Sequence, residues 1–209
     1  MSLRHASSLL AVTGAMLVPA AAAGCGADDA DRGEAVAASS EAETFGSDLI
    51  VELSTSEGPM LLELYPSLAP KHVDAFTARA ATGDYDGLSF HRVVPGYLVQ
   101  TGDPTGIGTG SDEGAPLALE PNDLSHRRGT LSMARLGHPD TAGSQFFICH
   151  GDADHLDGKY TAFGRMISGY ETLDAIASAP ADGERPIDPV SLHSVTVRSR
   201  TDDDPSPGL

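Results

Sequence analysis

Alternating apolar and polar positions predict a β-rich domain over residues 48–199. Over 49–53 every second residue is apolar, which is typical of a strand with one buried face. A turn is predicted at 56–59, where Gly and Pro stand together, and a second strand follows over 60–65, so the two strands form a hairpin. Further short strands are predicted over 88–93, 97–100, 130–134, 145–149, 161–166 and 190–197.

Two segments carry the apolar spacing of a helix instead. The first begins at 68 or 69 and ends near 81; Ser67 would cap its N-terminus and Gly83 would end it. The second is predicted over 170–178. Many short strands joined by Gly- and Pro-rich turns, together with two helices, indicate a mainly β fold: a closed antiparallel sheet with helical caps.

Residues 1–24 have the pattern of a secretory signal peptide. A charged start precedes an uncharged, Ala-rich run over 9–23, which is too short for a comfortable membrane span. The run ends in Ala-Ala-Gly-Cys at 22–25, which resembles the lipobox of bacterial lipoproteins, although the first Ala stands where that motif usually has Leu. The resemblance implies lipidation of Cys25 and an anchor at the cell envelope. Ordinary signal cleavage, which would release a soluble secreted protein, is the alternative.

Composition separates two flanking segments from the domain. Residues 25–47 are rich in Gly, Ala, Ser, Asp and Glu and predict a flexible acidic tether, and 200–209 predict a disordered acidic tail. The 13 Lys and Arg stand against 30 Asp and Glu, a formal net charge of -17, which disfavours nucleic acid as a partner. Two Cys exclude a disulfide framework, and the eight His lack metal-ligand spacing. We expect a monomer without metal or cofactor.

One segment, Phe90 to Gly106, combines groups that suit an uncharged substrate. Arg92 is an obligate cation, and the uncharged amide of Gln100 follows it. Between them stands an apolar pair, Tyr97 and Leu98. Such a combination can hold an apolar substrate group beside a strong hydrogen-bond donor. A second block, LSMARLGHPDTAGSQFFICHG, supplies matching apolar and amide groups.

Three long strings place the chain beside a known family. FHRVVPGYLVQTGDPTGIGTG, GTLSMARLGHPDTAGSQFFI and HLDGKYTAFGRMISGYETLDAI resemble the cyclophilin family of peptidyl-prolyl cis-trans isomerases, in the family's order and spacing. The resemblance covers the whole predicted domain. It implies an eight-stranded antiparallel barrel capped by two helices, with the substrate groove on the outside of the barrel. It also implies rotation about X-Pro peptide bonds, with proline-containing peptides as partners.

Position by position, the resemblance assigns roles to individual residues. The family's catalytic arginine falls on Arg92, and Gln100 and Tyr97 complete the implied catalytic set. The implied substrate-binding residues, which form the proline pocket or line the groove beside it, are Leu98, Ala134, Arg135, Gln145, Phe147, His155, Leu156 and Tyr160.

Three positions depart from the family's common pattern. Tyr97 replaces the commoner Phe, so its hydroxyl must find water or a partner. Arg135 stands where Asn is frequent, which adds a cation beside the groove. His155 stands where the best-known eukaryotic members have Trp, a residue that contributes to cyclosporin binding. We therefore expect weak cyclosporin affinity with isomerase activity retained.

Three functions compete at this stage. The first is a prolyl isomerase that assists the folding of unfolded exported proteins at the cell envelope. The second is a binding module that recognises proline-containing segments and turns them over slowly or not at all. The third, a hydrolase, lacks any nucleophile–base pair in the sequence pattern. The intact catalytic set favours the enzyme.

Overall fold

The computed structural model describes residues 48–110 and 116–206, so the predicted signal peptide, Cys25 and the tether lie outside the described residues. Within the described part, no helix is both long and apolar enough to cross a membrane. The large sheet contains β1 (Leu49–Thr55), β2 (Gly58–Leu64), β3 (Arg92–Val94), β4 (Leu98–Thr101), β5 (Thr130–Arg135), β6 (Ala142–Cys149), β7 (Ala162–Ser168) and β10 (Leu192–Ser199). The other elements are α1 (Pro70–Thr82), α2 (Tyr170–Ala177), the 3-10 helix η1 (Asp154–Leu156) and the hairpin of β8 (Ala181–Asp182) and β9 (Arg185–Pro186).

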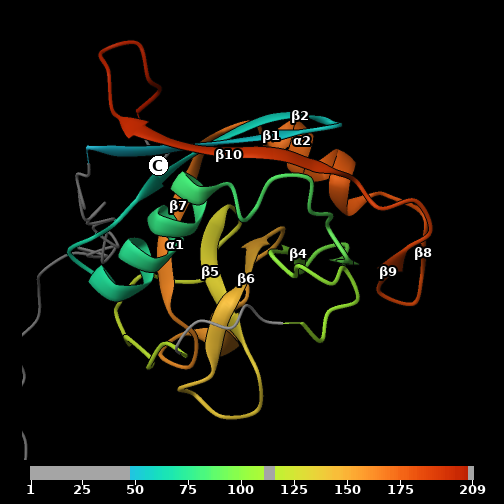
Figure 1. Cartoon of the computed structure of the whole chain (residues 1–209), viewed down its shortest axis with the longest axis horizontal. Coiled ribbons are helices and arrows are strands. Elements are labelled where there is room, and N and C mark those ends of the chain that lie inside the picture. The colour runs from blue at the N-terminus through green and yellow to red at the C-terminus, as the bar shows by residue number, and fades with distance from the viewer. Residues whose placement is uncertain (1–47, 111–115, 207–209) are drawn as a thin grey trace, which may run out of the picture. The chain divides into compact units, whose positions relative to one another are not determined.

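The eight strands form one antiparallel sheet in the order β10-β1-β2-β7-β5-β6-β4-β3, and the sheet curls on itself (Figure 1). The prediction of a closed barrel is wrong, because β3 and β10 remain edge strands. Loop residues connect the two edges: Ser89 bridges to Ser191, and the Phe90 N–H donates to the Val190 carbonyl at 3.0 Å. Strand β3 is too short to complete the ladder, and its outer edge is occupied by the β8–β9 hairpin, which contacts it. The architecture is therefore an open half-barrel with two helices.

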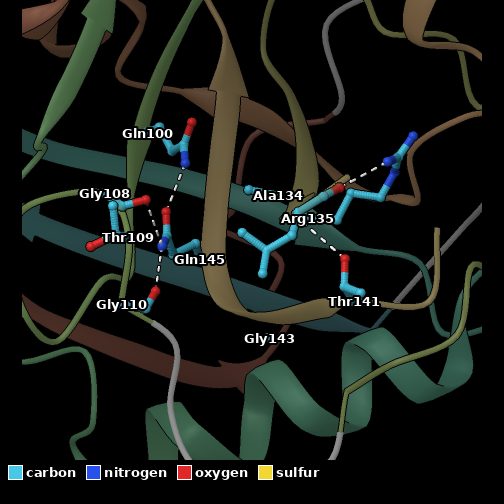
Figure 2. A pocket seen from close by; sticks show the side chains of 10 residues that line it. Gln100, Gly108, Thr109, Gly110, Ala134, Arg135, Thr141, Gly143 and Gln145 are labelled. Carbon is cyan, nitrogen blue, oxygen red and sulfur yellow. Dashed lines mark hydrogen bonds between the residues drawn. The ribbon is translucent and has the colours of Figure 1, made fainter. Parts of the chain in front are cut away.

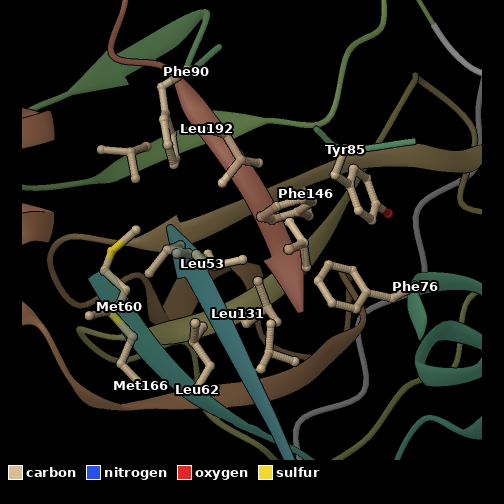
Figure 3. Close-up of a cluster of buried hydrophobic side chains, with 14 of the residues drawn as sticks. Leu53, Met60, Leu62, Phe76, Tyr85, Phe90, Leu131, Phe146, Met166 and Leu192 are labelled. Atoms are coloured by element: carbon tan, nitrogen blue, oxygen red, sulfur yellow. The ribbon is translucent and has the colours of Figure 1, made fainter. Parts of the chain in front are cut away.

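The concave side of the curled sheet holds the main hydrophobic core (Figure 3). Phe76 of α1 lies among aromatic rings, with ring centroids 5.2 Å from Tyr85, 5.3 Å from Phe146 and 5.4 Å from Phe163. All four side chains are fully buried. Burial of this much aromatic surface makes α1 and the sheet one packed unit.

The two ends of α1 are stabilised in different ways. Gly83 ends the helix in the left-handed conformation (φ 76°), as predicted. The predicted cap Ser67 is wrong: the N-cap residue is Ala69, and no side chain at that position accepts a bond. Instead the Glu120 carboxylate accepts hydrogen bonds from the N–H groups of Lys71 (3.2 Å) and His72 (3.0 Å). A carboxylate there satisfies free N–H groups and also complements the helix dipole.

The predicted acidic tail is described as far as Ser206, and its first residues form a turn. Asp204 accepts two hydrogen bonds from the Arg198 guanidinium, at 2.7 and 2.5 Å, and one from the Thr201 N–H at 2.8 Å. Arg198 belongs to β10, so an ion pair ties this part of the tail to the sheet. The prediction of a disordered tail rests on the acidic composition of residues 200–209, of which 207–209 lie outside the described residues.

Candidate active site

Strand pairing puts two of the three predicted catalytic residues, Arg92 and Gln100, in one row across the convex side of the sheet, whereas Tyr97 precedes β4. Arg92 on β3 lies opposite Gln100 on β4, and Gln100 lies opposite Phe147 on β6. Phe147 in turn lies opposite Ser132 on β5. Directly opposed residues share a face of the sheet. Arg92 and Phe147 are far apart in the chain, but both therefore lie next to the side chain of Gln100.

The polar side chains of this row form a continuous hydrogen-bond network. Arg92 Nη1 donates to Gln100 Oε1 at 3.2 Å, and Gln100 Nε2 donates to Gln145 Oε1 at 2.7 Å. Gln145 Nε2 donates in turn to the carbonyls of Gly108 and Gly110 (Figure 2). The two amides are thereby fixed in one orientation, and Gln100 presents its oxygen to the arginine.

Beside the network lies a small apolar cluster that is separate from the main core. Leu98, Phe147 and Leu156 are buried in it together with Cys149 and Ala153. Half-buried residues pack around this group: Tyr97, Ala134 and Tyr160. All the predicted residues of the proline pocket thus gather at one place on the convex side.

Tyr97 and His155 form one wall of the apolar cluster. Their rings stack at a centroid distance of 5.5 Å, and the Tyr97 hydroxyl lies 3.1 Å from His155 Nε2 in a hydrogen bond. His155 is therefore the hydrogen-bond partner that the Tyr97 hydroxyl was expected to need. Burial raises the pKa of Tyr97, although the nearby Arg92 cation opposes that shift. The hydroxyl stays neutral at ordinary pH.

Arg135 and Tyr160 form the opposite wall. The Arg135 guanidinium lies over the Tyr160 ring, 4.4 Å from its centroid, in cation–π geometry. Its Nε also donates to the Lys159 carbonyl at 3.2 Å. Tyr160 meets Phe147 edge-on, at a centroid distance of 6.0 Å and an interplanar angle of 80°. The Tyr160 ring thus lies between contacts with Arg135 and with Phe147.

His126, which the sequence pattern did not single out, lies behind the pocket. Its ring stacks against Phe147 at 6.1 Å. Its Nδ1 lies 2.8 Å from the Asp157 carboxylate, and its Nε2 lies 2.9 Å from the Ser132 hydroxyl. Burial lowers the pKa of His126, and the bond to Asp157 only partly opposes this. The ionised Asp157 carboxylate makes Nδ1 a donor, while Nε2 and the Ser132 hydroxyl share the second hydrogen bond of the ring.

Ser132, His126 and Asp157 are aligned in the manner of a hydrolase triad, which the sequence reading did not foresee. Ser132, however, is fully buried, and its hydroxyl also lies 3.0 Å from the Thr161 carbonyl, a second acceptor for its one proton. No substrate carbonyl can reach such an oxygen. The arrangement supports the Phe147 ring instead of a nucleophilic reaction.

A cavity of about 70 Å³ opens next to the apolar cluster (Figure 2). It shares Gln100, Ala134 and Gln145 with the groove, and Arg135 lines it as well. The remaining lining residues, which sequence reasoning missed, are Gly108, Thr109, Gly110, Leu136, Thr141 and Gly143. Most of them lie in loops, where no regular pattern marks them.

The chemistry of the site rests on hydrogen bonding and apolar contact. Over residues 48–110 and 116–206, no three His, Cys, Asp or Glu side chains gather as metal ligands would. Burial raises the pKa of the Cys149 thiol to about 12, so it is protonated and a poor nucleophile. Arg92, about one-third exposed, is the charged donor that faces the groove.

Comparison with known proteins places this geometry in a family. The model of the family described as "Cyclophilin type peptidyl-prolyl cis-trans isomerase/CLD" matches residues 50–197. The chain belongs to the cyclophilin family. That match includes every predicted site residue of the domain.

Relatives within the cyclophilin family differ in length. Human peptidyl-prolyl cis-trans isomerase-like 3 is 41% identical over 155 residues, which are 71% of this chain and 96% of the human protein. Peptidyl-prolyl cis-trans isomerase-like 2 of Cryptococcus neoformans is 42% identical over 153 residues, 69% of this chain, but the chain spans only 26% of that relative. A cyclophilin from Cryptosporidium parvum, solved in the presence of the dipeptide Ala-Pro, has a TM-score of 0.69 and 37% identity, covering 72% of this chain and 99% of that one.

Proposed function

We propose that this protein catalyses cis–trans isomerisation of X-Pro peptide bonds in exported proteins at the cell envelope. The observation that carries the catalytic part is the juxtaposition of Arg92, held by Gln100, with the apolar cluster around Phe147. A cation with free donors beside a pocket for a small apolar ring suits a prolyl bond. Membership in the cyclophilin family supports the same activity.

The reaction makes and breaks no covalent bond, so the protein needs no nucleophile. The barrier to rotation about a peptide bond is about 18–20 kcal/mol, because resonance gives the C–N bond double-bond character. Both isomers of a prolyl bond are populated, but they exchange only in tens to hundreds of seconds. A catalyst must favour the twisted state, in which the prolyl nitrogen carries a lone pair. Lowering the barrier by about 7 kcal/mol would accelerate the exchange about 10⁵-fold.

Arg92 is the residue to which we assign that stabilisation. One of its N–H groups would donate to the nitrogen lone pair, which is available only in the twisted state, so the arginine would bind the transition state more tightly than the ground state. Gln100 accepts from Nη1 and so restrains the guanidinium. Gln100 could serve either to orient Arg92 or to bind the substrate carbonyl, and this contact favours orientation.

The apolar cluster is assigned to the proline ring. Leu98, Phe147 and Leu156 would contact the pyrrolidine, with Tyr97 and Tyr160 at its sides. An apolar environment favours the twisted amide, because that amide has less charge separation than the planar one. A peptide with its proline on this cluster would bring a neighbouring side chain to the cavity beside Gln145.

The activity is tested by a prolyl isomerisation assay on a short peptide with wild-type protein and Arg92→Ala. We expect Arg92→Ala to lower kcat/KM about 100-fold or more, the effect of removing one preorganised donor from a transition state. Arg127→Ala is the matched control, because Arg127 is an exposed arginine paired with Asp152 and Asp154 away from the row. Equal rates for wild type and Arg92→Ala would refute the mechanism. No activity in any variant would favour the binding module.

The location and partners are proposed from the sequence. A signal peptide over residues 1–24, lipidation of Cys25 and the acidic tether over 25–47 would hold a monomeric domain away from a bilayer, where unfolded exported chains pass. Mass spectrometry of the mature N-terminus tests this: a diacylated or triacylated Cys25 is expected. An unmodified N-terminus produced by ordinary signal cleavage would instead indicate a released, soluble protein.

A further inference from the structure

The β8–β9 hairpin places one acidic side chain directly on the candidate catalytic arginine. Glu184 Oε2 accepts a hydrogen bond from Arg92 Nε at 2.6 Å. The two residues are 92 positions apart in the chain, and the sequence analysis did not include Glu184 in the site. The contact therefore depends wholly on where the hairpin folds.

The backbone holds Glu184 in this position. Asp182 pairs with Arg185, so Gly183 and Glu184 form a two-residue turn, and Gly183 takes the left-handed φ of 63° that such a tight turn favours. The Glu184 carbonyl accepts a hydrogen bond from the Val93 N–H at 2.7 Å. Val93 pairs with β4 on its other side. The turn is thus docked on the outer edge of β3, next to Arg92.

Two acceptors on different nitrogen atoms fix the plane of the guanidinium. Glu184 takes the Nε–H, and Gln100 takes one N–H of Nη1. Arginine has five N–H donors in a rigid fork. The other three donors of Arg92 make no hydrogen bond with any residue in the described ranges, so they remain for the substrate. With Gln100 alone, the guanidinium would be free to turn about that single bond.

A role in stability alone does not account for this pair. The Glu184 side chain is 56% exposed and that of Arg92 is 34% exposed. Exposed ion pairs contribute little to stability, because water screens the two charges. The Arg92 cation lowers the pKa of Glu184 through their hydrogen bond, so the carboxylate is ionised at neutral pH.

We propose that Glu184 is a positioning residue for the isomerase reaction: it orients Arg92 so that its free N–H groups face the prolyl nitrogen. The proposal rests on the isomerase function proposed above. Orientation of a reacting group contributes to the rate by presenting a geometry that is close to the productive one before the barrier is crossed. The hairpin that carries Glu184 is therefore part of the site, although it touches neither the pocket nor the substrate in this scheme.

The test compares four proteins in the isomerisation assay: wild type, Glu184→Ala, Glu184→Gln and the control Asp182→Asn. We expect Glu184→Ala to lower kcat/KM about fivefold, mainly through kcat. Glu184→Gln keeps an oxygen acceptor for Nε–H and should stay within about twofold of wild type. Asp182→Asn removes a negative charge from the same exposed hairpin and should leave the rate unchanged. An unaffected Glu184→Ala, or an equal loss in Asp182→Asn, would overturn the proposal.

A second measurement separates this proposal from the isomerase function itself. The NMR signal of the Arg92 Nε–H, assigned by its loss in Arg92→Lys, should shift or disappear through solvent exchange in Glu184→Ala and persist in Asp182→Asn. If wild type shows no isomerase activity, the proposed function fails and the NMR comparison still decides whether Glu184 holds Arg92. A signal that is identical in wild type and Glu184→Ala refutes the positioning role.

Discussion

The two faces of β6 are both buried, but one packs in the main core and the other forms part of the candidate site. Phe146 and Ile148 belong to the main core. Figure 3 shows Phe146 there among side chains of α1 and the sheet. Phe147, between them, belongs to the small cluster on the convex side. Phe147 is only 3% exposed, against 0% for its two neighbours, so accessibility barely distinguishes pocket from core.

What distinguishes the faces is their polar surroundings. Around Phe146 the rings of Phe76 and Tyr85 pack edge-on, within the main hydrophobic core. On the other face, Phe147 lies opposite Gln100, which bonds to both Arg92 and Gln145. The side chains of the concave face pack against one another in the core. The convex face instead carries the Arg92 cation, whose remaining N–H groups can bind a ligand. A single alternating strand therefore separates groups that hold the fold from groups that meet a ligand.

Substituting the two neighbouring phenylalanines gives the largest expected effect. Phe146→Ala removes a fully buried ring from a closed core and should cost about 3–5 kcal/mol of unfolding free energy. Phe147→Ala should cost about half as much, since its cluster borders the open groove. The activities should rank oppositely: Phe147→Ala lowers kcat/KM about tenfold or more, while folded Phe146→Ala stays near wild type.

Urea unfolding and the isomerisation assay on the same samples measure both quantities. Phe146→Leu is a milder variant that keeps the comparison usable if Phe146→Ala does not fold. Equal stability losses with full activity in Phe147→Ala would show that Phe147 is an ordinary core residue. The contrast between the two faces would then have no functional meaning.

Local patterns predicted the strands and helices well, because each is marked by its own neighbours in sequence. The apolar residues at 49, 51 and 53 predicted β1, and the spacing of apolar residues predicted α1 to within a residue or two at each end. The row of site residues could be predicted because the motifs around Arg92 and Gln145 resemble those of the cyclophilin family. Both the periodic patterns and the motifs consist of residues that are close together in the sequence.

Features that depend on distant partners could not be found this way. Glu120 caps α1 from 48 and 49 positions away, and nothing in the first turn of the helix points to it. Glu184 lies 92 positions from Arg92, in a hairpin of two-residue strands too short to carry a periodic pattern. The closed barrel was predicted because strand count alone does not show that β3 has three residues and an occupied outer edge.

Acidification should lower the unfolding free energy through protonation of His126. We expect this loss to be smaller than that of Phe146→Ala. Burial lowers the pKa of this histidine below its ordinary value near 6.5, so the folded state binds its proton less readily than the unfolded state. Stability is therefore fully present above about pH 6.5 and is lost as pH falls from there toward the folded pKa, by at most about 1.4 kcal/mol per pH unit for one proton.

The measurement is the unfolding free energy between pH 7.5 and 5 for wild type and His126→Gln. The variant should have a shallower slope, by up to one proton, and a disturbed Phe147 ring should lower its kcat/KM. The core-side histidine His72, whose pKa burial also lowers, remains as a source of slope in both proteins. Identical slopes for wild type and His126→Gln would mean that His126 does not link the pocket to pH.

The smallest expected change concerns the open wall of the groove. His155 is exposed and stacks on Tyr97, so a ligand can reach its outer face. An imidazole offers less apolar area than an indole, and we therefore expect cyclosporin to inhibit the wild type only weakly. His155→Trp should strengthen inhibition about fivefold with little change in stability, because the His155 side chain is exposed. An inhibition constant in the low nanomolar range for wild type would contradict the expectation. An unchanged affinity in His155→Trp would place the cause of weak binding elsewhere on the convex face, with Arg135 over Tyr160 as the next residue to vary.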